Sequence, residues 1–223
     1  MSEVGDGQIS FDDWTKRVFD HHVIDPEWWW KEETDWNNLP SSISLDYLSR
    51  LFEESSQLPH LYSDAQIDQG LWFLIGPRSD DIARFLLDLS IPWPMRLRAV
   101  RSIICLFELF ASRCSLHLSH LDEPGASPLN SICYMFWDIF PIQRRPDEPR
   151  HADLDDSLLT ILTEILSMPS DPCRESALHG LGHWHLSYPR EVEQIIDSFI
   201  VLNPTIRPEL RQYAGMARIG KVL

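Results

Sequence analysis

One stretch of the chain carries a carboxylate and two imidazoles at helical spacing. Glu175, His179 and His183 follow one another at intervals of four residues, and residues four apart lie on the same face of an α-helix. A face of this kind could bind zinc or iron. The alternative is a polar stripe between packed helices whose histidines are hydrogen-bonded, and we consider that the simpler interpretation. His185 would point about 200° away from His183 on the same helix, so we do not expect both histidines in one site.

A second candidate is the acidic, tryptophan-rich run DPEWWWKEETDW at residues 25–36. On a helix, three consecutive tryptophans span about 200° of arc, so at least one ring is expected to reach solvent. Indole rings and carboxylates together suit an interface, because both attract arginine and lysine from a partner. The alternative is that these rings pack the N-terminal helices together, a role we expect for at least two of the three. The predicted partner-binding residues are Asp12, Asp13, Trp28, Trp29, Trp30, Glu32, Glu33 and Trp36.

The charge of the chain supports that prediction. The 223 residues include 34 acidic and 19 basic side chains, a formal net charge of -15. Residues 1–93 contain 18 acidic and 6 basic side chains, and residues 94–223 contain 16 and 13. Seven of the nine tryptophans also lie in the first part. Proteins that coat nucleic acid need a cationic surface, so the acidity argues against that class and indicates a basic protein partner.

No catalytic motif accompanies these candidates. The sequence contains no H-E-x-x-H, no G-x-S-x-G and no P-loop. Gly180 and Gly182 stand in a helical pattern, where we expect them to permit close helix packing and not phosphate binding. We therefore predict a protein that is not an enzyme and has no cofactor.

The elements that must position these residues are predicted to be helices throughout. Residues that cap or begin helices precede each run of apolar residues at i, i+3 and i+4 spacing, and there is no alternating run flanked by hairpin turns. This pattern predicts an all-α fold of about ten helices. They start near Ser10, Ser44, Ser63, Ile82, Pro94, Pro128, Asp153, Asp171, Pro189 and Pro208.

The lack of a recognisable targeting or membrane segment and the scattered cysteines predict a soluble cytoplasmic protein. The start, MSEVGDGQIS, is acidic and lacks the apolar run of a signal peptide. No window reaches the length of about 18 apolar residues that a membrane helix needs. The four cysteines stand singly, without a CxxC pair, as expected for a reducing compartment.

Three of the predicted helices share a motif. PMRLRAVRSI at Pro94 and PCRESALHGL at Pro172 both fit Pro-x-Arg-x-x-Ala-φ-x-x-φ, where φ is aliphatic. PELRQYAGMA at Pro208 keeps the arginine and the alanine one position later. The spacing of the arginines is close to multiples of about 40 residues, the period of HEAT repeats. The sequence thus resembles the HEAT-repeat superfamily, and residues 153–223 are similar to the C-terminal part of uncharacterised bacterial HEAT-like proteins.

The resemblance implies a right-handed α-α superhelix of stacked helical hairpins, a HEAT-like solenoid. It implies one domain over 1–223, with an acidic, tryptophan-rich portion at 1–93 and a repeat portion at 94–223; the first portion does not show the repeat. Such scaffolds usually bind macromolecules. The function that we predict is a protein-binding module for a basic partner, such as an immunity protein that neutralises a bacterial toxin, or an adaptor.

Two alternatives stay open. The first is a metal-dependent enzyme that uses the Glu175, His179 and His183 face, although the paired His-Glu dipeptides of iron-binding HEAT hydroxylases are absent. The second is a nucleic-acid-processing protein, as among HEAT-like DNA glycosylases, with a groove formed by some of the 16 arginines. Our preferred interpretation is that these arginines pair with carboxylates such as Asp171 or Asp197 between repeats.

Overall fold

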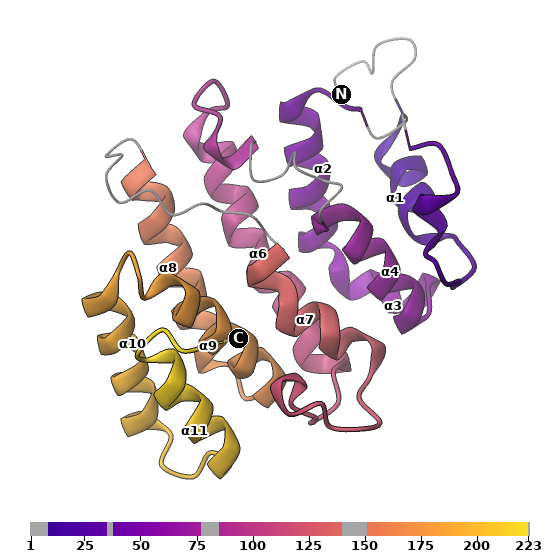
Figure 1. Cartoon of the computed structure of the whole chain (residues 1–223). Coiled ribbons are helices and arrows are strands. Elements are labelled where there is room, and N and C mark those ends of the chain that lie inside the picture. Colours follow the sequence, from indigo (N-terminus) through magenta and orange to yellow (C-terminus); the bar gives the residue numbers. More distant parts are fainter. Residues whose placement is uncertain (1–8, 35–37, 77–84, 140–150, 223) are drawn as a thin grey trace.

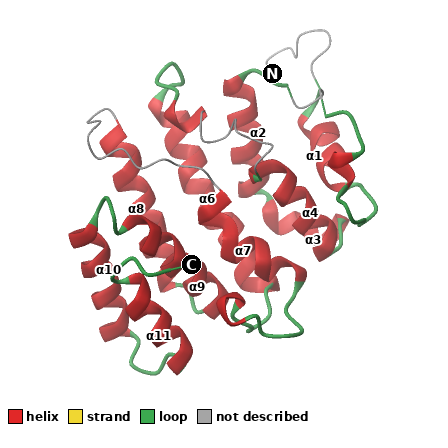
Figure 2. Cartoon of the chain, viewed as in Figure 1, coloured by secondary structure: helices red, strands yellow, loops and turns green. Residues whose placement is uncertain are grey.

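The computed structural model describes residues 9–34, 38–76, 85–139 and 151–222. The described residues form helices joined by loops and contain no strand (Figure 2), so the all-α prediction is confirmed for them. None of their helices combines the length and apolar composition that a bilayer crossing requires.

The main helices of the N-terminal part are α1 (Phe11–Phe19), α2 (Ser41–Glu53) and α4 (Asp64–Ile75). Short helical turns also occur here, namely η1 (Trp28–Trp30), η3 (Ser55–Gln57) and α3 (Leu58–Leu61). The C-terminal part contains α6 (Trp93–Arg113), η4 (Ser119–Leu121), α7 (Pro128–Ile139), α8 (Ala152–Ser167), α9 (Asp171–Trp184), α10 (Pro189–Leu202) and α11 (Pro208–Ala217).

Most predicted helix starts are confirmed by their cap geometry. The Ser10 hydroxyl accepts the Asp13 N–H at α1, and Ser63 forms a reciprocal capping box with Gln66 at α4. Proline occupies the first turn of α6, α9, α10 and α11, where its missing N–H costs no helical hydrogen bond. Of the short helix predicted from Ile82, only residues 85–89 are described, and 85–87 are helical.

Two predicted helix starts were wrong. Ser44 lies inside α2, which begins at Ser41 after Pro40, and Asp153 lies in the first turn of α8, whose N-cap is His151. At its C-terminal end, α6 stops at Arg113, and Asn130 hydrogen-bonds the Ser115 N–H and carbonyl in the turn that follows. The last helix, α11, ends at Ala217, and Gly220 follows with a positive φ of 67°.

The helices pack as two rows (Figure 1). One row contains α2, α6, α8 and α10, and the other contains α1, α4, α7, α9 and α11. From α2 onward the main helices alternate between the rows along the chain. The N-terminal part joins the C-terminal part through both rows, since α2 packs on α6 and α4 packs on α7.

The core lies between the two rows. Phe107 of α6 contacts Phe136 of α7 edge to face, with ring centroids 5.3 Å apart. Gly180 of α9 lets this helix approach closely, since a Cβ there would lie 2.7 Å from Trp137 Cγ and 2.9 Å from Leu162 Cδ2. At Gly182 a Cβ would lie 2.6 Å from Val222. Close helix packing is therefore confirmed at Gly180, whereas Gly182 makes room for the chain that follows α11.

Candidate functional site

The three consecutive tryptophans of the predicted interface have different environments. Trp28 and Trp29 are 2% and 6% exposed, and both pack on Phe73 of α4. Trp28 also stacks on the His21 ring at 3.7 Å. These two indoles belong to the core and cannot contact a partner without leaving it, so their assignment to the interface is corrected. Trp30 is 59% exposed, and its Nε1 donates to the Glu27 carboxylate at 3.0 Å.

Two glutamines of α4 hold the backbone between α1 and η1, on the N-terminal side of Trp30. Gln66 Nε2 donates to the carbonyl oxygens of Phe19 and His21, and Gln69 Nε2 donates to that of Ile24 at 2.9 Å. The segment therefore has a defined conformation although it contains no regular helix beyond η1. Its exposed apolar side chains are Val23, Ile24 and Trp30.

The predicted acidic residues are exposed before and after this segment in the chain. Asp12 and Asp13 are exposed in the first turn of α1, and Glu32 and Glu33 are exposed after η1. Only weak intramolecular ion pairs involve them, such as Asp12 with Arg50 at 4.0 Å and Glu32 with His21 at 3.7 Å. Trp36 lies outside the described residues.

Another carboxylate, Asp68 of α4, is buried beneath the same segment. Its pKa is raised from 3.8 to about 7, because burial and the charge of Glu27 together outweigh a hydrogen bond from Trp72 that lowers it. Its Oδ1 atom has no hydrogen-bond partner among the described residues. This region thus combines exposed acidic side chains with a largely buried carboxyl group whose ionisation is disfavoured.

The predicted metal-binding face of α9 is divided between two clusters. Glu175 is fully buried and directs its carboxylate at η4, where it accepts the Ser119 N–H at 3.0 Å and the His120 N–H at 2.8 Å. The His120 Nδ1 atom lies 2.5 Å from the same carboxylate. Glu175 therefore closes the loop before α7 and is not placed with the two histidines, a correction to the predicted trio.

Asp138 of α7 takes the place expected for Glu175. His183 Nε2 lies 2.6 Å from Asp138 Oδ1, and His179 Nε2 lies 2.9 Å from Asp138 Oδ2. The two histidine Nε2 atoms are 3.2 Å apart. Asp138 was not predicted from the sequence because it is distant along the chain, although it is the one charged side chain of α7.

Two tyrosines support this cluster from the core side. Tyr213 of α11 places its hydroxyl 2.6 Å from His179 Nδ1 and 3.0 Å from the Tyr134 hydroxyl. Burial raises the pKa of Tyr213, as do the hydrogen bond to Tyr134 and the nearby charges of Glu175 and Asp138. Tyr213 therefore remains a neutral phenol that holds the His179 ring in one orientation.

His185 lies apart from the cluster, as its helical position predicts. Its Nε2 atom is 3.4 Å from Glu193, and its ring lies against Gly220.

No cysteine is disulfide-bonded, and Cys133 and Cys173 are buried.

Several described arginines of the C-terminal part are paired within the chain. Arg218 binds Asp197 in a bidentate pair at 2.7 and 2.9 Å, and Arg207 lies 2.7 Å from Glu123. Arg174 lies 3.5 Å from Asp171. Arg96 is buried and donates to the Leu86 and Ile91 carbonyls. Asp171 and Asp197 thus do pair with arginines, but the first pair lies within α9 and the second joins the consecutive helices α10 and α11, so the predicted pairing between repeats is not shown.

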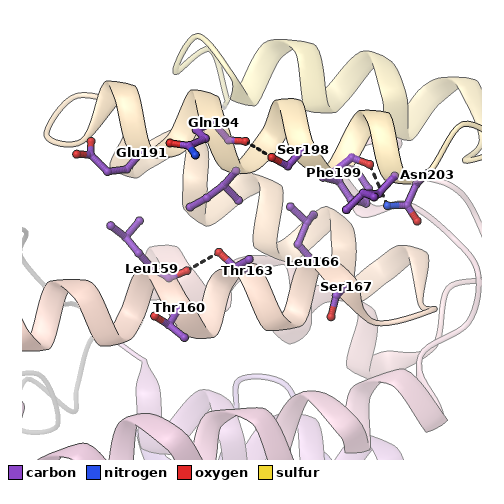
Figure 3. Close-up of a pocket in the computed structure, with 12 residues that line it drawn as sticks. Leu159, Thr160, Thr163, Leu166, Ser167, Glu191, Gln194, Ser198, Phe199 and Asn203 are labelled. Atoms are coloured by element: carbon purple, nitrogen blue, oxygen red, sulfur yellow. Dashed lines mark hydrogen bonds between the residues drawn. The ribbon is translucent and has the colours of Figure 1, made fainter.

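A groove between α8 and α10 was not predicted from the sequence (Figure 3). It has a volume of about 410 Å³. Leu159 and Leu166 of α8 face Phe199 of α10, and hydroxyl and amide side chains of the two helices also line the groove.

Comparison with models of known protein families, with curated proteins and with solved structures finds no match for this chain.

Proposed function

We propose that this protein is a non-enzymatic protein-binding module that presents an acidic, aromatic surface to a basic protein. The surface comprises Asp12, Asp13, Trp30, Glu32 and Glu33. The observation that carries the proposal is the exposure of Trp30 on a segment whose neighbours Trp28 and Trp29 are anchored in the core. A large exposed side chain on an ordered backbone loses little conformational entropy on binding, which favours affinity.

The charge distribution supports a basic partner. Carboxylates of the surface make only long ion pairs within the chain, whereas Arg207 and Arg218 of the C-terminal part are already paired at short distance. A nucleic-acid interface would need unpaired cations on one face, so the pairing of Arg207 and Arg218 supports the protein-binding alternative. Complementary charge would accelerate association with a cationic protein.

The scaffold that we propose is a HEAT-like solenoid. Three helices that carry the Pro-Arg-Ala motif are α6, α9 and α11, and main helices alternate between two rows from α2 onward. Stacked hairpins of this kind provide extended surfaces for macromolecules. An acidic cytoplasmic module of this size suits an immunity protein that occludes a bacterial toxin, or an adaptor.

The test is to co-purify the partner from the native host and to measure its binding to purified variants. Reversal of Asp12, Asp13, Glu32 and Glu33 to lysine should slow association at least about 10-fold at low salt. Trp30→Ala should raise Kd by about 30-fold, as expected for a buried aromatic anchor.

Matched controls are available in the C-terminal part. Reversal of Asp153, Asp156, Glu164 and Glu191, all exposed and partly in first helical turns, should leave the association rate within about 2-fold. Leu202→Glu tests the groove between α8 and α10. Binding that survives the first reversal but is lost with Leu202→Glu would refute the acidic surface as the interface.

A further inference from the structure

The cluster of Asp138, His179 and His183 has the composition of a metal site. One carboxylate oxygen and two imidazole nitrogens lie within 4.8 Å of one another. Zinc is bound in proteins by this kind of N and O donor set, with Zn–N distances of about 2.0–2.1 Å. Ligands in a tetrahedron of that size are separated by about 3.3 Å, and the two histidine Nε2 atoms are 3.2 Å apart.

The positions of the donors allow an ion to enter. His179 is fully buried, whereas the side chains of Asp138 and His183 are 26% and 35% exposed. The donors therefore lie at the surface end of the contact between α7 and α9, with His179 at its base. Three protein ligands would leave a fourth coordination position facing solvent, the arrangement of open zinc sites.

The residues behind the cluster satisfy a further requirement of metal sites. A histidine that binds a metal through one ring nitrogen usually donates a hydrogen bond from its other ring N–H. That hydrogen bond fixes the ring orientation and so directs the metal-binding nitrogen. His179 Nδ1 is 2.6 Å from the Tyr213 hydroxyl, which in turn lies 3.0 Å from Tyr134. The Nε2 atom of His179 is thereby directed at Asp138 and His183.

We propose that Asp138, His179 and His183 bind one divalent transition-metal ion, with zinc as the preferred occupant. Imidazole is a borderline ligand, so the two histidines favour zinc over the harder magnesium or calcium, and a carboxylate oxygen is also a ligand that zinc accepts. The ion would take the place of the protons that lie between the two imidazole nitrogens and the Asp138 carboxylate, and it would link α7 to α9. This proposal is independent of the acidic surface, because none of its ligands belongs to that surface.

The first measurement is zinc binding by the full chain after treatment with a chelator and dialysis. Titration against a chromophoric chelator should give one zinc ion per chain, and zinc should raise Tm in a concentration-dependent way. Cobalt(II) in place of zinc should give the visible absorption of a tetrahedral N and O site. A wild-type chain that binds no stoichiometric zinc would overturn the proposal.

The ligands are tested with variants that keep side-chain size. Asp138→Asn and His183→Gln should each weaken zinc binding more than about 100-fold, beyond the loss expected for outer-shell residues. Because both side chains are partly exposed, these variants should fold, which far-UV circular dichroism verifies. His185→Gln, on the same helix but outside the cluster, is the matched control and should bind zinc like the wild type.

Tyr213→Phe tests the positioning role of the hydroxyl behind His179. It should weaken zinc binding by about 10-fold while retaining one ion per chain and the cobalt spectrum. Equal zinc affinity in wild type, Asp138→Asn and His183→Gln would refute the assigned ligands, even if zinc binds elsewhere.

Discussion

Buried carboxylates are treated differently in the two parts of this protein. In the N-terminal part, Asp68 lies beneath the Trp30 segment with Glu27 nearby and a hydrogen bond from Trp72, and its pKa rises to about 7. In the C-terminal part, the buried Glu175 receives two backbone N–H groups and faces His120, and the partly exposed Asp138 faces two histidines. Burial is tolerated in the second case because donors surround the charge.

The difference indicates what each part is organised to do. In the C-terminal part, arginine and histidine pair with several of the acids inside the chain, and residues 94–223 have 16 acidic and 13 basic side chains. The N-terminal part has 18 acidic and 6 basic side chains over residues 1–93; some of its acids also pair with arginine, as Glu53 does with Arg98, but Asp68 is largely buried beside another acid, Glu27. A basic partner would supply the missing positive charge, and the following substitutions test this contrast.

The largest effect is expected at Glu175. Glu175→Ala leaves the Ser119 and His120 N–H groups without their acceptor, and breaking a buried charged network costs about 3–5 kcal/mol. Urea denaturation measures the free energy of unfolding, and the exposed Glu164→Ala should change it by less than about 0.5 kcal/mol. A loss below about 1 kcal/mol at Glu175 would remove the contrast between the two parts.

Trp28→Ala should be nearly as destabilising, because it removes a buried indole from the contact with Phe73. Large-to-small changes of this kind cost about 3 kcal/mol or more. Trp30→Ala is the matched control two residues away, and we expect it to change the free energy of unfolding by less than about 0.5 kcal/mol. Similar losses for both variants would mean that Trp30 belongs to the core and not to an interface.

Asp68→Asn should stabilise the protein by about 1–3 kcal/mol at pH 8. The folded chain holds this proton up to about pH 7, whereas the unfolded chain releases it near its ordinary pKa of 3.8. The free energy of unfolding of the wild type therefore falls as pH rises between these values, and the advantage of Asn shrinks as pH falls from about 7 towards about 4. Thermal denaturation at several pH values measures it, and a variant with no advantage at pH 8 would contradict the raised pKa.

The smallest effects are expected at the exposed arginine pairs. Arg98→Ala in the N-terminal contact and Arg218→Ala in the C-terminal contact each remove a bidentate pair with a carboxylate. Exposed ion pairs contribute up to about 1 kcal/mol and weaken with salt. We expect equal, salt-sensitive losses in the free energy of unfolding. A much larger loss for only one of them would show that the two parts also differ in their surface pairs.

The candidate site could be predicted only in part. Helical spacing placed His179 and His183 on one face, and composition located the acidic, tryptophan-rich portion. Asp138 was missed because its position depends on how α7 packs against α9, and Glu175 was misassigned because the loop before α7 provides its donors. The exposure of Trp30 alone among the three tryptophans depends on contacts with α4.

The sequence by itself determined the helices, because caps, prolines and apolar spacing act within one or two turns of the chain. It also determined where the net charge lies, since composition needs no fold. Only the tertiary structure decided which helices are neighbours, and hence which carboxylate meets which histidine, because such contacts join residues such as Asp138 and His179 that are 41 positions apart. The helical spacing of side chains determines which residues share a face of a helix. The residues that this face meets, such as Asp138 for His179, depend on which helix packs against it.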